Sequence, residues 1–256
     1  MPKTMKKYFT YDWKFEDKPA IYSVDLDFLE CARIRVRSGV IEEREKTPLL
    51  KVTIGNRRQS VLCEKEIRKL IELAQRLAAK SCACLVGTIQ CGLVLRLYLY
   101  EGNVGSLDDF SALISAEKGF KKECVIEDDI DYFTYRNLLL PDSAKIQTEY
   151  NRENLEFLRE RGDTLAPRRL NIHMAFPNEP ASIAFADKAR ESGFAVGIYE
   201  DTGDIDFAFG LVIHKVCALE KSEVDALTTD VIRIAEDFGG KLTFWDCPAQ
   251  SVLKRR

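Results

Sequence analysis

The sequence predicts an α+β protein made of two tandem ferredoxin-like sandwiches, each with one antiparallel sheet. Three observations lead to this prediction. The 256 residues suffice for two domains of ordinary size. Each half of the chain alternates amphipathic helical segments with short apolar strands. In both halves the segments follow the order βαββαβ, in which the apolar side of each helix needs a sheet face to cover.

The second half shows this order most clearly. It opens with a helical segment at 151–163, which carries Leu155 and Leu158 on one side and ends near Gly162. Four strands are expected, at 168–177, 194–200, 205–219 and 241–247. Two helices are expected between them, at 178–193 and 220–240. Asn178 and Ser222 are predicted to cap these helices, and "DTGD" (201–204) is predicted to be the turn of a hairpin.

The first half has the same order after an N-terminal hairpin, predicted from "KYFTYDWKF" and "PAIYSVDLDFL". Strands are expected at 48–55, 83–90, 93–102 and within 120–140. Helices are expected at 63–81 and 106–119, the second opened by a capping box at Ser106. We therefore expect an N-terminal α+β domain of unknown function at 1–145 and a second domain at 146–256, joined near 141–151.

Composition limits the class of protein. With 46% hydrophobic and 31% charged residues, the chain can bury ordinary cores. No apolar run approaches the roughly 18 residues of a membrane-spanning helix, and the first residues lack the apolar stretch of a signal peptide. These features favour a cytoplasmic protein without a membrane partner. The eight cysteines are then expected as reduced thiols, although a metal site using Cys82, Cys84, Cys91 and a histidine stays open.

The charge of the second half is negative. Residues 151–253 contain 11 lysines and arginines against 18 aspartates and glutamates, a net charge of −7, and Lys254-Arg255-Arg256 follow. Phe207-Ala208-Phe209 resembles the core of an RNA-recognition strand, but Asp204 and Asp206 occupy positions where such a strand needs a cation. Because affinity for nucleic acid depends on neutralised phosphates, no direct nucleic-acid partner is expected.

The residue patterns of nucleophilic catalysis and nucleotide binding are missing. The chain has no Gly-x-Ser-x-Gly elbow, no Cys–His signature, no P-loop and no Gly-x-Gly-x-x-Gly. We therefore expect no enzyme, no catalytic residues and no cofactor. One alternative is a metal-dependent hydrolase or nuclease that uses the acidic segment 127–131, with His173 and His214 on one sheet face. A solvated turn explains this segment equally well, and it lacks the spacing of a calcium loop, so no metal site is predicted.

A second acidic cluster lies at the predicted hairpin of the C-terminal half. The cluster is either a polar turn or a negative surface that meets a basic protein, because surface charge steers encounter and selects partners. We expect the second role, with two further carboxylates from the preceding helix. The predicted protein-binding residues are Glu200, Asp201, Asp204, Asp206, Asp187 and Glu191.

The run "IHMAFPNEPASIAFADKARESGFAVGIYE" (172–200) resembles the bacterial regulator of ribonuclease E activity B family, the ribonuclease E inhibitor proteins. The likeness covers about 150–250, from the helix "NRENLEFLRERGD" to "AEDFGGKLTFWDC". The resemblance implies a ferredoxin-like C-terminal domain, fused here to an N-terminal domain of unknown function. It also implies a non-catalytic regulator whose acidic surface docks on ribonuclease E and alters RNA processing. A small-molecule sensor that binds between the two sandwiches is a further alternative.

Overall fold

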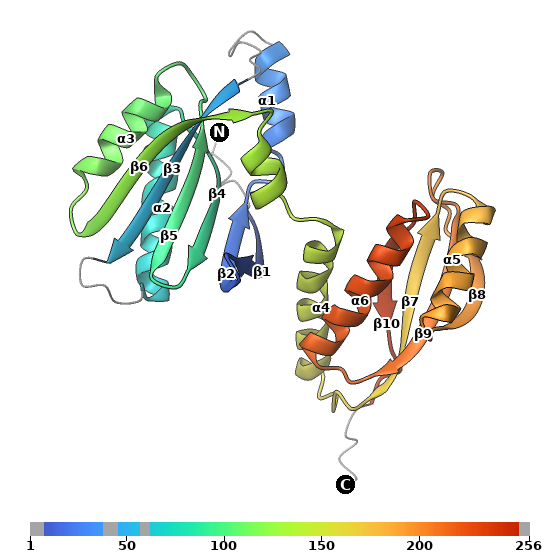
Figure 1. Ribbon diagram of the computed structural model, residues 1–256. Helices are drawn as coiled ribbons and strands as arrows, with labels where there is room; N and C mark the ends of the chain where they lie inside the picture. Colours follow the sequence, from blue (N-terminus) through green and yellow to red (C-terminus); the bar gives the residue numbers. More distant parts are fainter. Residues whose placement is uncertain (1–7, 38–45, 57–61, 251–256) are drawn as a thin grey trace. The chain divides into compact units, whose positions relative to one another are not determined.

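The computed structural model (Figure 1) describes residues 8–37, 46–56 and 62–250. The chain divides into two compact units, Met1–Leu140 and Pro141–Arg256. Each unit contains one antiparallel sheet and a set of helices, which confirms the predicted α+β class. No helix in the described ranges is long and apolar enough to cross a membrane.

The N-terminal sheet has six strands in the order β1-β2-β4-β5-β3-β6. Within it, β4-β5-β3-β6 is the predicted ferredoxin-like sheet, and the predicted hairpin β1–β2 extends it beside β4. The strands are β1 (Phe9–Phe15), β2 (Lys18–Val24), β3 (Lys46–Asn56), β4 (Cys84–Cys91), β5 (Val94–Tyr100) and β6 (Phe120–Ile130). The helices are α1 (Phe28–Arg37), α2 (Glu64–Ser81), α3 (Ser106–Ala116) and the π-helical turn η1 (Tyr135–Leu139).

Both faces of this sheet are covered, because side chains alternate along its strands. In β5, Leu97 and Leu99 enter a Leu/Ile core under α2 and α3, whereas Tyr98 and Tyr100 point to the other face. There they join an aromatic cluster that includes Phe28 of α1 and Tyr135 of η1. The sheet is therefore the middle layer of three.

The structure corrects three sequence expectations in this unit. Residues 131–140 are not strand, because a helical turn packs Tyr135 and Leu139 against the sheet. Helix α1 was not expected from the sequence. Ser106 makes no capping box: Gly105 is the N-cap, at φ +80°, and the Ser106 hydroxyl accepts from the backbone N of Gly102 (3.1 Å). The preceding turn therefore uses the group that would have capped α3.

The C-terminal sheet has four strands in the order β10-β7-β9-β8. Because β7 and β8 both run antiparallel to β9, which lies between them, the topology is the split βαβ arrangement of a ferredoxin-like unit. The strands are β7 (Arg168–Phe176), β8 (Ala195–Asp201), β9 (Phe209–Cys217) and β10 (Lys241–Asp246). Figure 1 shows the three helices on one side of the sheet: α4 (Ser143–Glu160), α5 (Glu179–Glu191) and α6 (Lys221–Glu236).

The ends of several elements differ from expectation in this unit. Helix α4 begins at Ser143 rather than 151, and its N-cap Asp142 accepts from the backbone N of Lys145 (2.8 Å). Strand β9 begins at Phe209 rather than 205, because the preceding residues form a folded loop. Asn178 caps α5 as predicted, whereas the N-cap of α6 is Glu220 and not Ser222.

One buried amide connects α4 to the rest of the unit. Asn151 is 0% exposed, and its Nδ2 donates to Asp225 Oδ1 and Thr228 Oγ1 of α6, both at 2.9 Å. Its Oδ1 accepts from Trp245 Nε1 of β10 (2.7 Å) and from Gln147 Nε2 (2.9 Å). All the hydrogen-bonding capacity of the amide is therefore used inside the protein.

A buried ion pair fixes the chain at the other end of α4. Asp163 and Arg168 have side chains that are each only 4% exposed, and Arg168 Nη1 is 3.2 Å from Asp163 Oδ2. Arg168 also donates to Pro248 O (3.0 Å), and the backbone N of Gln250 donates to Asp163 Oδ2 (2.9 Å). The pair therefore joins the turn after α4, the start of β7 and the segment after β10.

We expect Asn151→Ala to lower the free energy of unfolding of the C-terminal unit by about 3 kcal/mol, because buried donors and acceptors on three elements lose their partner. Urea denaturation followed by tryptophan fluorescence measures this loss. Glu153→Ala, on the exposed side of the same helix, is the control and should change stability by less than about 0.5 kcal/mol. Equal effects of the two substitutions would contradict the role given to the amide.

We expect Asp163→Asn to cost about 3 kcal/mol at pH 7, because it leaves a buried guanidinium without its anion. Hydrogen bonds from Arg168 lower the pKa of Asp163 from 3.8 to about 2, so its stabilisation is fully present above pH 3.8 and is lost as the pH falls through about 2. Denaturation at several pH values should show wild type and variant converging in acid. A difference that stays constant down to pH 2 would refute this assignment.

Candidate functional site

The acidic loop, residues 202–208, is an ordered turn between β8 and β9. The backbone N of Thr202 donates to Ala208 O (3.1 Å), and Gly203 adopts φ +71°, a conformation that glycine allows. Asp204 N donates to Thr202 Oγ1 (3.1 Å), and Asp206 N donates to Asp204 Oδ1 (3.0 Å). These bonds fix the backbone that carries the two predicted carboxylates.

Lys241 connects the acidic loop to the far edge of the sheet. Its Nζ lies 3.0 Å from Asp204 Oδ2 and 3.9 Å from the ring centroid of Phe207. Because Lys241 begins β10 and the loop follows β8, the loop folds back from one sheet edge toward the other. The hydrogen bond from Lys241 lowers the pKa of Asp204 below its ordinary value, so this carboxylate stays ionised.

The six predicted binding residues do not gather at one point. Asp187 and Glu191 lie on α5, where they pair with Arg190 (2.6 Å) and Lys188 (2.9 Å). Helix α5 leads into the start of β8, whereas the acidic loop follows its end, about 23 Å away along seven residues of strand. Glu200 and Asp201 end β8, and their side chains lie outside the described residues.

Exposed apolar side chains surround the acidic loop, and sequence reasoning missed them as binding residues. Ile205, between the two aspartates, is 97% exposed. Ile198 and Tyr199 of β8 and Phe209 at the start of β9 are also exposed. The sequence predicts Ile205 as the first residue of the strand at 205–219, whereas the structure places it in the loop before β9. The loop thus combines negative charge with apolar groups that a partner can cover.

The sheet face opposite the helices carries both histidines, as predicted. Strand pairing places His173 opposite Val212 and Asn171 opposite His214, which puts these side chains on one face. His173 Nε2 lies 2.8 Å from Asp246 Oδ2, and its ring stacks on Phe244 at a centroid distance of 4.0 Å. Asp246 also accepts from Asn171 Nδ2 (2.7 Å). These bonds orient the His173 ring along the sheet.

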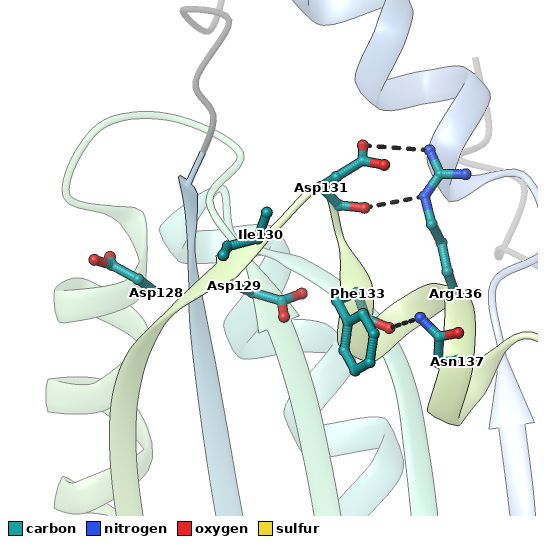
Figure 2. Close-up of a pocket in the computed structure, with 7 residues that line it drawn as sticks. All are labelled: Asp128, Asp129, Ile130, Asp131, Phe133, Arg136 and Asn137. Atoms are coloured by element: carbon teal, nitrogen blue, oxygen red, sulfur yellow. Dashed lines mark hydrogen bonds and ion pairs between the residues drawn. The ribbon is translucent and has the colours of Figure 1, made fainter.

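The acidic segment 127–131 of the N-terminal unit spreads its carboxylates in different directions. Glu127 pairs with Lys51, and Asp131 interacts with Arg136. In Figure 2, Asp128 points to the opposite side of the strand from Asp129, and Asp131 turns toward Arg136. The segment borders a shallow open pocket of about 490 Å³ that is also lined by Ile130, Phe133, Arg136 and Asn137.

Asp129 is the buried member of this segment. Its carboxylate accepts hydrogen bonds from the Tyr100 hydroxyl, from Thr134 N (3.1 and 3.2 Å) and from Thr134 Oγ1 (3.1 Å). Burial, with the bond to Asp129, raises the pKa of Tyr100 far above its ordinary value of 10, so the phenol stays protonated and donates. Asp129 therefore holds the turn before η1 against β5.

The described residues contain no group of three or more histidines, cysteines, aspartates or glutamates placed to hold one metal ion. Cys84 and Cys91 begin and end β4, about 23 Å apart along the strand. Cys82 is exposed at the C-cap of α2. The three cysteines considered for a metal site therefore do not converge.

Comparison with known proteins gives a match for the C-terminal unit. Residues 148–247 match the family model described as regulator of ribonuclease activity B, which confirms the resemblance found in the sequence, whereas no family model matches the N-terminal unit. No curated protein matches the chain. Among solved structures, an unknown protein from Galdieria sulphuraria is similar over 78% of this chain and 97% of its own, at 11% identity and a TM-score of 0.22.

The position of Asp129 predicts a structural role. Asp129→Ala should destabilise the N-terminal unit by about 2 kcal/mol, because buried donors of Tyr100 and Thr134 lose their acceptor. Asp128→Ala, one residue away and exposed, should have little effect. Thermal denaturation of both variants, with and without Mg²⁺ or Ca²⁺, measures this. If either cation stabilised the wild type and not Asp129→Ala, a ligand role would replace the structural one.

Proposed function

We propose that this protein regulates a ribonuclease by binding it, because residues 148–247 match the family model described as regulator of ribonuclease activity B. In this proposal the ribonuclease is ribonuclease E, and binding alters its RNA-processing activity. The protein contributes a surface and no chemical step. The family's description supports this regulatory role.

The charge of the C-terminal unit supports a basic partner. Residues 151–253 have a net charge of −7, and Asp204 is held ionised by its hydrogen bond from Lys241. Asp206 is exposed beside it on an ordered backbone. A negative surface attracts a positively charged segment and orients its approach.

The apolar side chains of the loop define the partner more closely. Ile205 projects between Asp204 and Asp206, and Tyr199 and Phe209 are exposed near the same end of the β8–β9 hairpin. Binding energy in protein interfaces concentrates in apolar and aromatic anchors with polar groups around them. We infer that Ile205 is the anchor and that its partner is a basic segment carrying an apolar or aromatic residue.

The two groups of carboxylates receive different roles in this proposal. Asp204, Asp206, Glu200 and Asp201 adjoin Ile205 in the sequence and form the primary contact. Asp187 and Glu191 lie near the start of β8 and already pair with cations of α5. They extend the surface for a partner long enough to follow β8, and their contribution to affinity is smaller because exposed ion pairs contribute little.

The test uses purified ribonuclease E from the source organism and the full-length protein, with affinity measured by calorimetry at two salt concentrations. Asp204→Lys with Asp206→Lys should weaken binding by about tenfold or more, with a larger loss at low salt. Ile205→Ser should weaken binding by a similar factor at both salt concentrations, because it removes apolar contact and no charge.

A matched control makes the same change in net charge elsewhere. Glu236→Lys with Asp237→Lys alters exposed residues at the end of α6 and should leave affinity within about twofold. Equal losses from the two double substitutions would show that only net charge matters and would refute the loop as the contact. Wild-type protein that does not bind ribonuclease E would refute the proposed partner.

A further inference from the structure

Strand β6 is an unusually regular edge of the N-terminal sheet. It pairs with β3 over all 11 residues, from Phe120 to Ile130, without a register shift. Its other side pairs with no strand in the part of the chain that the structure describes. By contrast, the edge strands β8 and β10 of the C-terminal sheet both contain shifts in their pairing. A long, regular edge offers its backbone groups to a further strand.

The middle of β6 exposes apolar side chains on both faces of the sheet. Val125 and Ile126 are each 46% exposed, and successive residues of a strand point to opposite faces. Both would be covered by a strand added beside β6. Charged residues flank them, with Lys121 and Glu123 on one side and Glu127 and Asp128 on the other. This order of charges limits which strand can be added.

We propose that β6 is the interface with a second copy of this chain, in which the two β6 strands pair antiparallel around a two-fold axis at Cys124. Such a pairing joins the two sheets into one continuous sheet. It is isologous, because each copy contributes the same strand. Residues that face each other across the axis must point to the same face of the sheet, so the axis passes through a residue and not between two.

Five registers pair at least seven residues of β6 with a second β6, and only one of them places no two like charges opposite each other. With the axis at Cys124, Lys121 faces Glu127 of the second copy at two symmetric places, and Glu123 faces Val125. With the axis at Val125, Lys121 faces Asp129 and Lys122 faces Asp128, but Asp129 is buried and Lys122 already donates to Ile114 O. In the same register Glu123 faces Glu127 at two symmetric places. With the axis at Glu123 or Ile126, Glu123 faces another Glu123 or Asp129, and with the axis at Glu127, Glu127 faces another Glu127. Like charges directly opposite each other are destabilising, which selects the Cys124 register.

Other roles of these residues agree with this register. Lys122 donates to Ile114 O (2.7 Å) at the end of α3, so it is not needed across the axis, where it faces Ile126. Glu127 pairs with Lys51 on the neighbouring strand β3, and Lys121 of the second copy would add a second cation on its other side. Glu127 and Asp128 also disfavour any register that pairs the C-terminal halves of the two β6 strands with each other.

The register places two Cys124 residues directly opposite each other. Opposed residues in antiparallel strands have Cα atoms about 4.5–5.5 Å apart, which lies within the range of a disulfide. The first experiment uses full-length protein carrying Cys63→Ser and Cys82→Ser, because those two cysteines are exposed. Sedimentation under reducing conditions should show a dimer, and copper–phenanthroline should convert it to a covalent dimer. Adding Cys124→Ser should abolish the covalent dimer and keep the non-covalent one.

A charge exchange tests the pairing without oxidation. Lys121→Glu places two carboxylates opposite each other, and Glu127→Lys places two ammonium groups opposite each other, so each variant alone should be monomeric. An equimolar mixture should form a heterodimer, because each of the two contacts then joins a glutamate to a lysine. Lys69→Glu, on the exposed side of α2, is the control and should leave the dimer intact.

Three results would overturn the proposal. The first is a wild-type chain that sediments as a monomer at every concentration. The second is a dimer that persists in both single variants. The third is an equimolar mixture of the two variants that stays monomeric. Circular dichroism of each variant confirms that loss of the dimer is not loss of the fold. None of these measurements involves a ribonuclease, so the outcome is independent of the proposed function.

Discussion

The amide of Asn151 determines how the C-terminal unit is assembled. It joins α4 to α6 and, through Trp245, to β10. Strand β10 is an edge strand whose pairing with β7 contains a register shift, so the bond to Trp245 is an important restraint on its position. The same six-residue strand begins with Lys241, which holds Asp204 of the acidic loop. A polar group in the interior is thereby connected, through strand β10, to a charged group on the surface.

The two units share one sheet topology, but they differ in whether the second face of the sheet is buried. In the N-terminal unit, α1 and η1 bury the second face of the sheet under an aromatic cluster. In the C-terminal unit, the corresponding face displays His173, stacked on Phe244 and bonded to Asp246. A covered sheet has only its edges for contact with other strands, whereas an open one also offers a face. The same arrangement of strands therefore supports different kinds of surface, depending on what is added before and after the six core elements.

The order of the elements was predictable because hydrophobic periodicity reflects burial on one side of a helix or strand. Prediction from periodicity failed where burial depends on contacts between residues that are distant in the sequence. Tyr135 and Leu139 looked like strand residues, yet they form a helical turn because the sheet face beneath them accepts aromatic side chains. The location of the acids was predictable, but the partner of Asp204 was not, since Lys241 lies 37 positions further along the chain. The exposure of Ile205 likewise follows from that folded loop and not from local pattern.

The segment that matches the regulator-family model is shorter than the folded unit that contains it. Gln147, which bonds to Asn151, and the helix cap Asp142 precede residue 148. Pro248 and Gln250, which bond to Arg168 and Asp163, follow residue 247. A fragment cut at the limits of the family match would leave buried groups unsatisfied at both termini. Anyone who excises this unit should therefore begin at Pro141 and continue through Gln250.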